Sequence, residues 1–189
     1  MVSKGKAHQK ITEVADLVGA KLIVMGTNGG PLGFSNKIIG SKAVRVVSKS
    51  TCLVITIKGK EHFNGCRTII LPLDLEKETK QKVKYALTLA CLCRATVKVV
   101  SVVERDDFGA LSSLKANLRQ VQNYLSGRGV KSTTEHINFN GRYLSKSVLD
   151  YSTLHQADLI MIMTQQENYF TQYLIGSARN EYSPRSKDK

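Results

Sequence analysis

The chain has 189 residues, of which 42% are hydrophobic and 23% charged, so it is long enough to bury a core and form one or two ordinary domains. No apolar run reaches the length of a membrane span, and the start lacks the apolar core of a signal peptide. We therefore expect a cytoplasmic protein without a membrane partner. The net charge of +13, from 28 Lys and Arg against 15 Asp and Glu, suits phosphate-bearing partners. Because these basic residues are scattered without interleaved aromatics, the pattern favours a solvated surface over a nucleic-acid face.

The apolar residues alternate between helical and strand patterns along the chain. Helical spacing from Ala7 to Val18 ends at Gly19, and the apolar run Leu22–Met25 predicts a buried parallel strand. A helix from Ser41 and the β-branched strand Cys52–Ile57 follow. Later patterns predict strand 68–74, helix 79–93, strand 97–103, helix 111–125, strand 132–139, helix 144–154 and strand 159–163. This alternation predicts an α/β fold with a parallel sheet and helices on both faces.

A glycine-rich loop joins strand 22–25 to the helix that starts at Ser41. Glycines let a backbone approach a ligand closely, and a helix N-terminus presents unpaired N–H groups and a positive dipole end to an anion. The loop therefore predicts a phosphate cradle. The alternative is a plain strand-to-helix turn, which many α/β proteins make with glycine.

An internal repeat divides the chain. Residues Ala20–Thr27 match Ala157–Thr164, and Ile39–Ser41 match Ile175–Ser177. The first copy starts at the helix before its loop strand, whereas the second has the earlier strands but ends in a polar tail that contains Pro184. We predict the C-terminal part of a first domain over 1–58, a linker over 59–65, a second domain without its last strand over 66–178, and a polar tail over 179–189.

The loop, the repeat and the segment Leu71–Asp74 resemble the universal stress protein (UspA) family in its tandem two-domain form, with the first domain truncated. The resemblance covers nearly the whole chain. It implies a five-stranded parallel sheet of the adenine nucleotide alpha hydrolase-like type and a role in stress response. It also implies that the chain binds ATP, together with Mg²⁺, through a Gly-x2-Gly-x9-Gly-Ser/Thr loop. Carried over to this sequence, the loop comprises Gly26, Thr27, Gly29 or Gly30, Gly40 and Ser41, and the adenosine positions are Asp74 and Val102.

The chain departs from the family pattern in both copies. Gly29 lies one residue too far from Gly40, although counting from Gly30 restores the nine-residue gap. In the second copy Met163 and Gln166 replace glycines and would narrow the cradle, so we expect no phosphate there.

The predicted site is also divided between the copies, because the glycine-rich loop belongs to the first copy and Asp74 to the second. Three arrangements are open. The first copy docks on the second within one chain, it exchanges between chains of a dimer, or the sequence is a fragment of a longer tandem protein, which the broken repeats favour.

Other chemistry has little support in the sequence. The four His and four Cys show no paired metal-ligand motif, and no nucleophile is accompanied by a base, so we predict no metal site and no catalytic residues. Any ATP hydrolysis would be slow and incidental. Two functions remain: a nucleotide-binding stress-response regulator, and a nucleotide-independent scaffold that forms homo-oligomers through the apolar edge strand 52–57.

Overall fold

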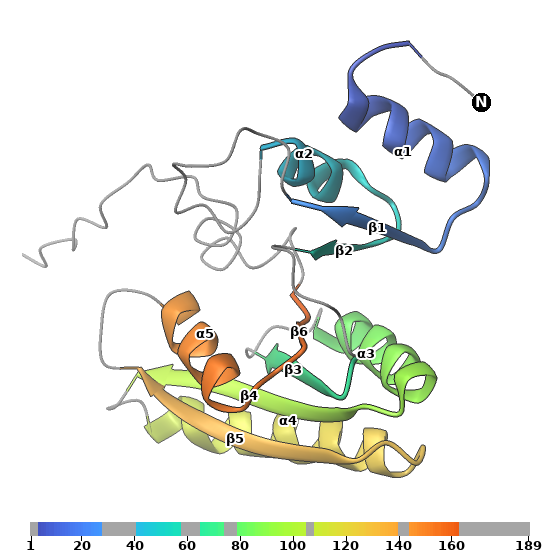
Figure 1. The fold of residues 1–189 in the computed structure, drawn as a ribbon. Coiled ribbons are helices and arrows are strands. Elements are labelled where there is room, and N and C mark those ends of the chain that lie inside the picture. Colours follow the sequence, from blue (N-terminus) through green and yellow to red (C-terminus); the bar gives the residue numbers. More distant parts are fainter. Residues whose placement is uncertain are drawn as a thin grey trace, which may run out of the picture. The chain divides into compact units, whose positions relative to one another are not determined.

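The computed structural model describes residues 4–27, 41–57, 65–73, 79–104, 108–139 and 144–162. They fall into two compact units, one containing residues up to Gly59 and the other residues Lys60–Thr171 (Figure 1). The domain bounds predicted from the sequence stay predictions. Among the described helices, none has the length and apolar character needed to cross a membrane.

The first unit contains two helices and two strands. In chain order these are α1 (Ala7–Leu17), β1 (Leu22–Gly26), α2 (Ser41–Lys49) and β2 (Leu53–Ile57). β1 and β2 pair in parallel, from Leu22 opposite Leu53 to Gly26 opposite Ile57. Ala15 of α1, Ile23 of β1 and Val46 of α2 form a small buried core between the helices and one face of this sheet.

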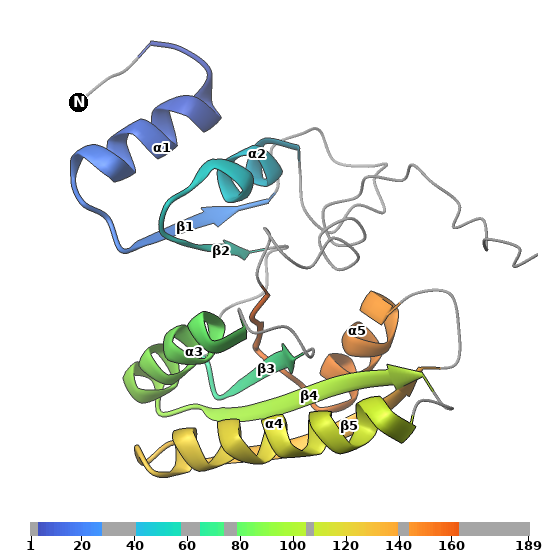
Figure 2. The ribbon, with the colours of Figure 1, turned by 180° about the vertical axis from the view of Figure 1, so that it is seen from behind.

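The second unit contains a four-stranded sheet. Its elements are β3 (Thr68–Leu73), α3 (Thr79–Cys93), β4 (Thr96–Glu104), α4 (Phe108–Ser126), β5 (Ser132–Phe139), α5 (Leu144–Leu154) and β6 (Leu159–Ile160). The strand order is β5-β4-β3-β6, and every pair is parallel. α3 and α4 cover one face of the sheet and α5 covers the other (Figures 1 and 2). The order of the strands explains this arrangement. The connections from β3 to β4 and from β4 to β5 run in one direction across the sheet, whereas α5 connects β5 to β6 in the other direction, and a right-handed crossover in that direction places the helix on the opposite face.

Both faces of this sheet are buried at its centre. Ile69 and Val97 pack against α3 and α4, whereas Ile70 and Val100, at an odd number of residues from them along the same strands, point to the opposite face. All four side chains are fully buried. Near-continuous apolar runs are what a parallel sheet covered on both sides requires, and they are the pattern from which these strands were predicted.

The predicted fold class is confirmed, as are the type and order of the predicted elements. The bounds differ at some ends: α4 begins at Phe108, three residues before the predicted start, and β6 ends at Ile160, where its pairing with β3 stops. The described residues form sheets of two and four strands. The five-stranded sheet that the family resemblance implies is therefore not seen among them.

Four of the helix-to-strand turns share one geometry. In each, the residue that follows the turn donates its backbone N–H to the carbonyl five positions earlier: Ala20 to Ala15, Ala95 to Ala90, Val130 to Leu125 and Ala157 to Ser152, at 2.8 to 3.1 Å. The preceding residue has a positive φ in every case: Gly19 at 63°, Arg94 at 53°, Gly129 at 80° and Gln156 at 47°. This is the left-handed helix ending that glycine adopts most easily. Two of the four turns have Arg94 or Gln156 in place of glycine, and these residues bear the conformational cost of the left-handed backbone.

We expect Arg94→Gly to raise the free energy of unfolding of the second unit by about 1 kcal/mol, because glycine removes the cost of the left-handed conformation. Gly129→Ala should lower it by a similar amount through φ alone, since no atom lies within 4 Å of a Cβ built there. Urea unfolding followed by circular dichroism measures both. Arg94→Ala is the control for loss of the side chain, and equal stabilisation by Ala and Gly would contradict the backbone explanation.

Candidate functional site

The part of the predicted phosphate loop that the structure describes is its beginning and its end. Gly26 is the last residue of β1, Thr27 follows it, and α2 begins at Ser41. All three belong to the first unit. The strand, the loop and the N-terminus of α2 therefore stand in the order that an anion-binding loop requires.

Thr27 fixes the start of the loop to the neighbouring strand. Its backbone N–H donates to the carbonyl of Ile57 at 2.9 Å, and its hydroxyl Oγ1 donates to the same oxygen at 3.2 Å. The side chain is buried. Both polar groups of Thr27 are thus used to hold the end of β1 against the end of β2, which gives this residue a positioning role.

Gly26 lies in open space among the described residues. A Cβ built on it meets no atom within 4 Å, and its φ lies outside the positive region that favours glycine. Among these residues, neither the local backbone nor packing requires a glycine at this position. The open position leaves room for a ligand to approach the backbone.

The other predicted site residues are only partly placed. Val102 is half-buried in β4, opposite Ile137 of β5, and so belongs to the second unit. Ser41 is described by its backbone alone. Gly29, Gly30, Gly40 and Asp74 lie outside the described residues, as do Met163 and Gln166 of the second loop. The three arrangements considered for the divided site therefore all stay open.

Positive charge gathers beside the N-terminal half of α1. His8 of that helix is buried, and its pKa is lowered, first by burial and then by the charges of Arg45, Lys49 and Lys6. Arg45 and Lys49 come from α2, so the two helices bring these cations around one imidazole. Spacing in the sequence gave no sign of this cluster, because about forty residues separate Lys6 and His8 from Arg45 and Lys49.

A Ser-His pair, also missed from the sequence, joins two strands of the second unit. Ser101 Oγ lies 2.7 Å from His136 Nδ1, and the two residues are opposite one another in β4 and β5. Ser101 is fully buried, so no substrate reaches its hydroxyl. The pair is therefore structural, and only the strand register, which periodicity does not determine, could have revealed it.

His136 gives the second unit a predictable response to acid. Its pKa is lowered, first by burial and then by Lys115 of α4. The unfolded chain therefore takes up a proton at a higher pH than the folded one, and stability falls as the pH drops from about 6.5 towards the lower folded value. We expect His136→Gln to make this fall shallower.

The measurement is the urea midpoint at pH 7.5 and pH 5.5 for both proteins. Lys115→Gln is the control, because it leaves the imidazole in place and should raise the pKa of His136 towards its usual value. An unchanged pH dependence in His136→Gln would contradict the assignment.

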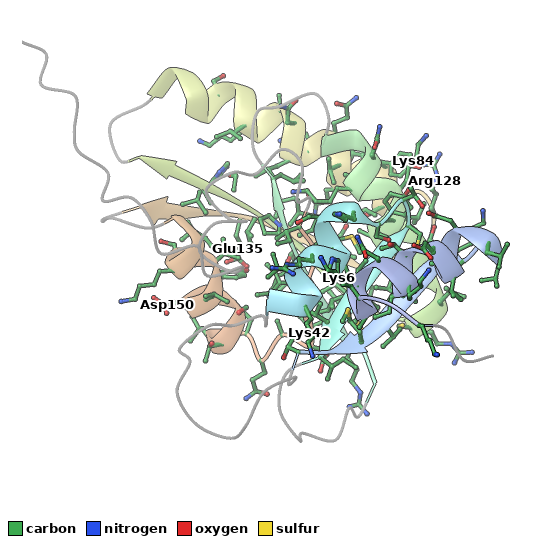
Figure 3. All side chains as sticks on the ribbon, turned by 90° about the horizontal axis from the view of Figure 1, so that it is seen from above. Lys6, Lys42, Lys84, Arg128, Glu135 and Asp150 are labelled. Carbon is green, nitrogen blue, oxygen red and sulfur yellow. The ribbon has the colours of Figure 1, made fainter. Side chains whose placement is uncertain are left out.

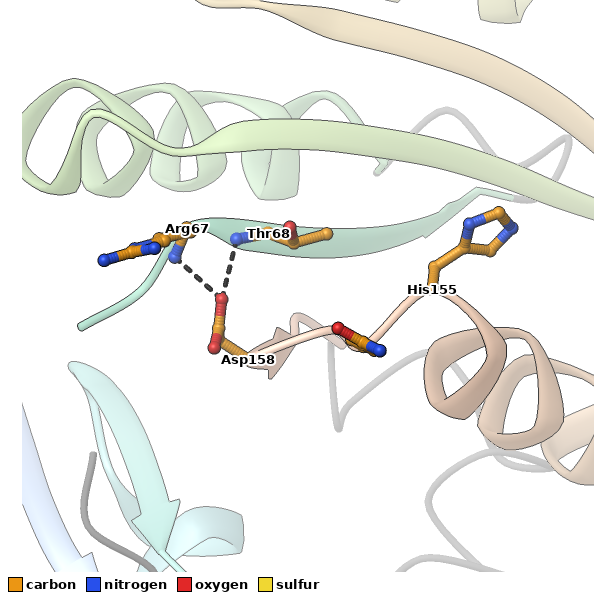
Figure 4. Close-up of a pocket in the computed structure, with 5 residues that line it drawn as sticks. Arg67, Thr68, His155 and Asp158 are labelled. Carbon is orange, nitrogen blue, oxygen red and sulfur yellow. Dashed lines mark hydrogen bonds between the residues drawn. The ribbon is translucent and has the colours of Figure 1, made fainter. Parts of the chain in front are cut away.

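A shallow pocket of about 360 Å³ lies at the N-terminal ends of β3 and β6 (Figure 4). Its acidic group is engaged: the Asp158 carboxylate accepts the backbone N–H groups of Arg67 at 2.8 Å and Thr68 at 2.9 Å. Asp158 therefore ties β6 to the start of β3. The pocket belongs to the second unit, and none of the predicted site residues line it.

Residues 1–58 match the sequence model of the Universal stress protein family. No curated protein matches the chain. The matched residues contain the complete glycine-rich loop and all of the first unit that the structure describes. The family resemblance predicted from the sequence is confirmed for these residues, which belong to the first copy, whereas the tandem two-domain form with a truncated first domain stays a prediction.

Solved structures show a similar fold. The crystal structure of a universal stress protein from Archaeoglobus fulgidus DSM 4304 has 15% identity and a TM-score of 0.64, over 89% of this chain and 60% of that chain. A proposed universal stress protein from Pseudomonas aeruginosa UCBPP-PA14 has 18% identity and a TM-score of 0.57, over 83% and 57%. An A. fulgidus universal stress protein in complex with dAMP has 16% identity and a TM-score of 0.45, over 50% and 78%. The chain spans about three fifths of the length of the first two structures.

Proposed function

We propose that this protein is a nucleotide-binding regulator of the universal stress protein type, and that its ligand is ATP, with Mg²⁺, held by the loop between β1 and α2. The observation that carries the proposal is the open position of Gly26, at the start of a loop whose glycines are all present in the family-matched segment. A loop rich in glycine suits a ligand whose phosphates approach the backbone closely.

The electrostatics of α2 support an anion at its N-terminus. The first turn of α2 carries no acidic residue that would repel an anion. The unpaired N–H groups and the positive end of the helix dipole favour a negative charge at this end of the helix. Triphosphate is therefore the part of ATP that the first unit is suited to hold.

Adenosine recognition is assigned, from the family resemblance, to Asp74 and Val102. These residues belong to the other copy, so the proposal includes assembly of the two halves, within one chain or between chains. The protein acts in the cytoplasm by changing what it associates with when the nucleotide orders the loop. Hydrolysis of ATP is slow and incidental, and no residue is assigned to catalyse it.

We expect saturable binding of Mg-ATP in a calorimetric titration, weakened at least about tenfold by Gly40→Val and by Gly26→Val, because a side chain would occupy the space of the phosphates. Gly26→Val should fold normally, since no described atom obstructs its Cβ. Circular dichroism checks this. The absence of binding by the folded natural chain would overturn the proposal.

The same titration tests the two halves separately. Asp74→Ala should weaken ATP but leave the binding of inorganic triphosphate unchanged if the adenosine half assembles. Equal affinities of natural chain and Asp74→Ala for ATP would show that only the phosphate half is formed.

A second candidate function, a self-associating scaffold, is favoured by the surface of β1 and β2. Leu22 is 42% exposed, Val24 58% and Ile57 40%, and the strand register places all three on the sheet face that is turned away from the core. An apolar sheet face, beside strand edges that no other described strand pairs with, is a typical association surface.

If the scaffold function holds, Val24→Lys should shift the molar mass measured by light scattering from oligomer towards monomer. Leu92→Lys is the matched control, because Leu92 is 78% exposed on α3 of the second unit and belongs to no such face. A monomeric natural chain, or equal effects of the two substitutions, would contradict association through β1 and β2.

A further inference from the structure

A stripe of cations runs along α2. Lys42, Arg45 and Lys49 are three and four residues apart, which places them on one side of a helix. All three side chains are exposed. The buried residues Ala43 and Val46 lie between them in sequence, so the stripe faces away from the core while α2 is held by its apolar side.

Lys6, at the start of α1, extends this stripe. Three cations lower the pKa of buried His8: Lys6, Arg45 and Lys49. Lys6 lies at the start of α1 and the other two on α2, and these two helices pack together. Figure 3 labels Lys6 and Lys42 on these helices. We call the surface formed by Lys6, Lys42, Arg45 and Lys49 the α1–α2 basic face.

The charge of this face is not neutralised by the described residues around it. Segments 4–27 and 41–57 contain the cations Lys4, Lys6, Lys10, Lys21, Lys42, Arg45 and Lys49 but only two acids, Glu13 and Asp16. Glu13 pairs with Lys10, and Asp16 accepts a hydrogen bond from the Thr51 hydroxyl at 2.7 Å. Both acids are thus engaged with other residues, and the described part of the chain gives the four cations of the face no ion pair.

The composition of the face indicates how it would recognise an anion. The described segments of the first unit contain no Phe, Tyr or Trp, so there is no aromatic platform on which unpaired bases could stack. α2 also exposes no large hydrophobic side chain that could insert into a membrane, and those that α1 exposes, Val14 and Leu17, lie at the opposite end of that helix from Lys6. What remains is a row of cations, which suits closely spaced phosphates, and duplex nucleic acid presents phosphates at the highest density.

We infer that the α1–α2 basic face, formed by Lys6, Lys42, Arg45 and Lys49, binds the phosphate backbone of double-stranded nucleic acid without reading its sequence. The sequence alone favoured a solvated surface, because the basic residues look scattered until α1 and α2 are packed together. This binding is separate from the proposed nucleotide site, which lies at the loop before α2.

The test is fluorescence anisotropy of a short labelled RNA or DNA duplex with the full chain, repeated over a series of KCl concentrations. Four phosphate contacts predict a slope of log affinity against log salt of about −3.6. Arg45→Gln and Lys49→Gln should each make the slope shallower by about 1 and weaken binding equally for duplexes of different sequence. Both residues are exposed, so the variants should fold.

Lys84→Gln is the matched control, because it removes the same charge from an exposed position on α3 of the second unit. It should leave the slope unchanged. An equal loss in Lys84→Gln and Arg45→Gln would overturn the inference, since net charge would then explain the binding. Stronger binding to vesicles of anionic lipid than to the duplex would also overturn it. Gly40→Val should keep the duplex affinity of the natural chain, which separates this result from the outcome at the nucleotide loop.

Discussion

The parallel pairing of β1 with β2 is the interaction on which the candidate site depends. The ladder runs from Leu22 opposite Leu53 to Gly26 opposite Ile57, and Thr27 continues it with two hydrogen bonds to the Ile57 carbonyl. This anchor therefore holds the chain in place at Thr27, where it leaves the sheet. A sheet of two strands is marginal alone, so the packing of α1 and α2 on one face is what maintains the ladder.

The two units differ in the size of their hydrophobic cores. The second unit has the larger core, with fully buried residues on β3, β4 and α4, whereas the core of the first unit is small and leaves Val24 exposed on the free face of its sheet. The loop strands of both units nevertheless begin after turns with the same hydrogen bonds, formed around Gly19 in one and Gln156 in the other. The first unit keeps the glycines that suit a ligand, and the second keeps the apolar residues that suit a stable fold.

The fold was predictable because its signals are local. Apolar runs bounded by Gly or polar residues predicted the order and type of the elements, and Gly19 marked the end of the first helix. The turn at Arg94 was not marked, because its hydrogen bonds impose a left-handed conformation on a residue that does not favour it. The Ser101–His136 pair was also missed, since strand register decides which residues of two strands meet. Of the candidate site, the sequence predicted the strand, the loop and the helix that follows, whereas the anchoring role of Thr27 depends on a contact thirty residues away.

α2 contributes to both anion sites that we propose for the first unit, but through different groups. The proposed nucleotide site uses backbone N–H groups at the N-terminus of α2, which any sequence with the right geometry would provide, whereas the inferred duplex-binding site uses only the side chains of the α1–α2 basic face. The position of both depends on Val46, which is fully buried between the helices and the sheet. A change at Val46 would therefore disturb both features through the fold. A change at Arg45 removes charge from the exposed side of the helix and leaves the loop geometry as it is, so the two kinds of anion binding are separable in this chain.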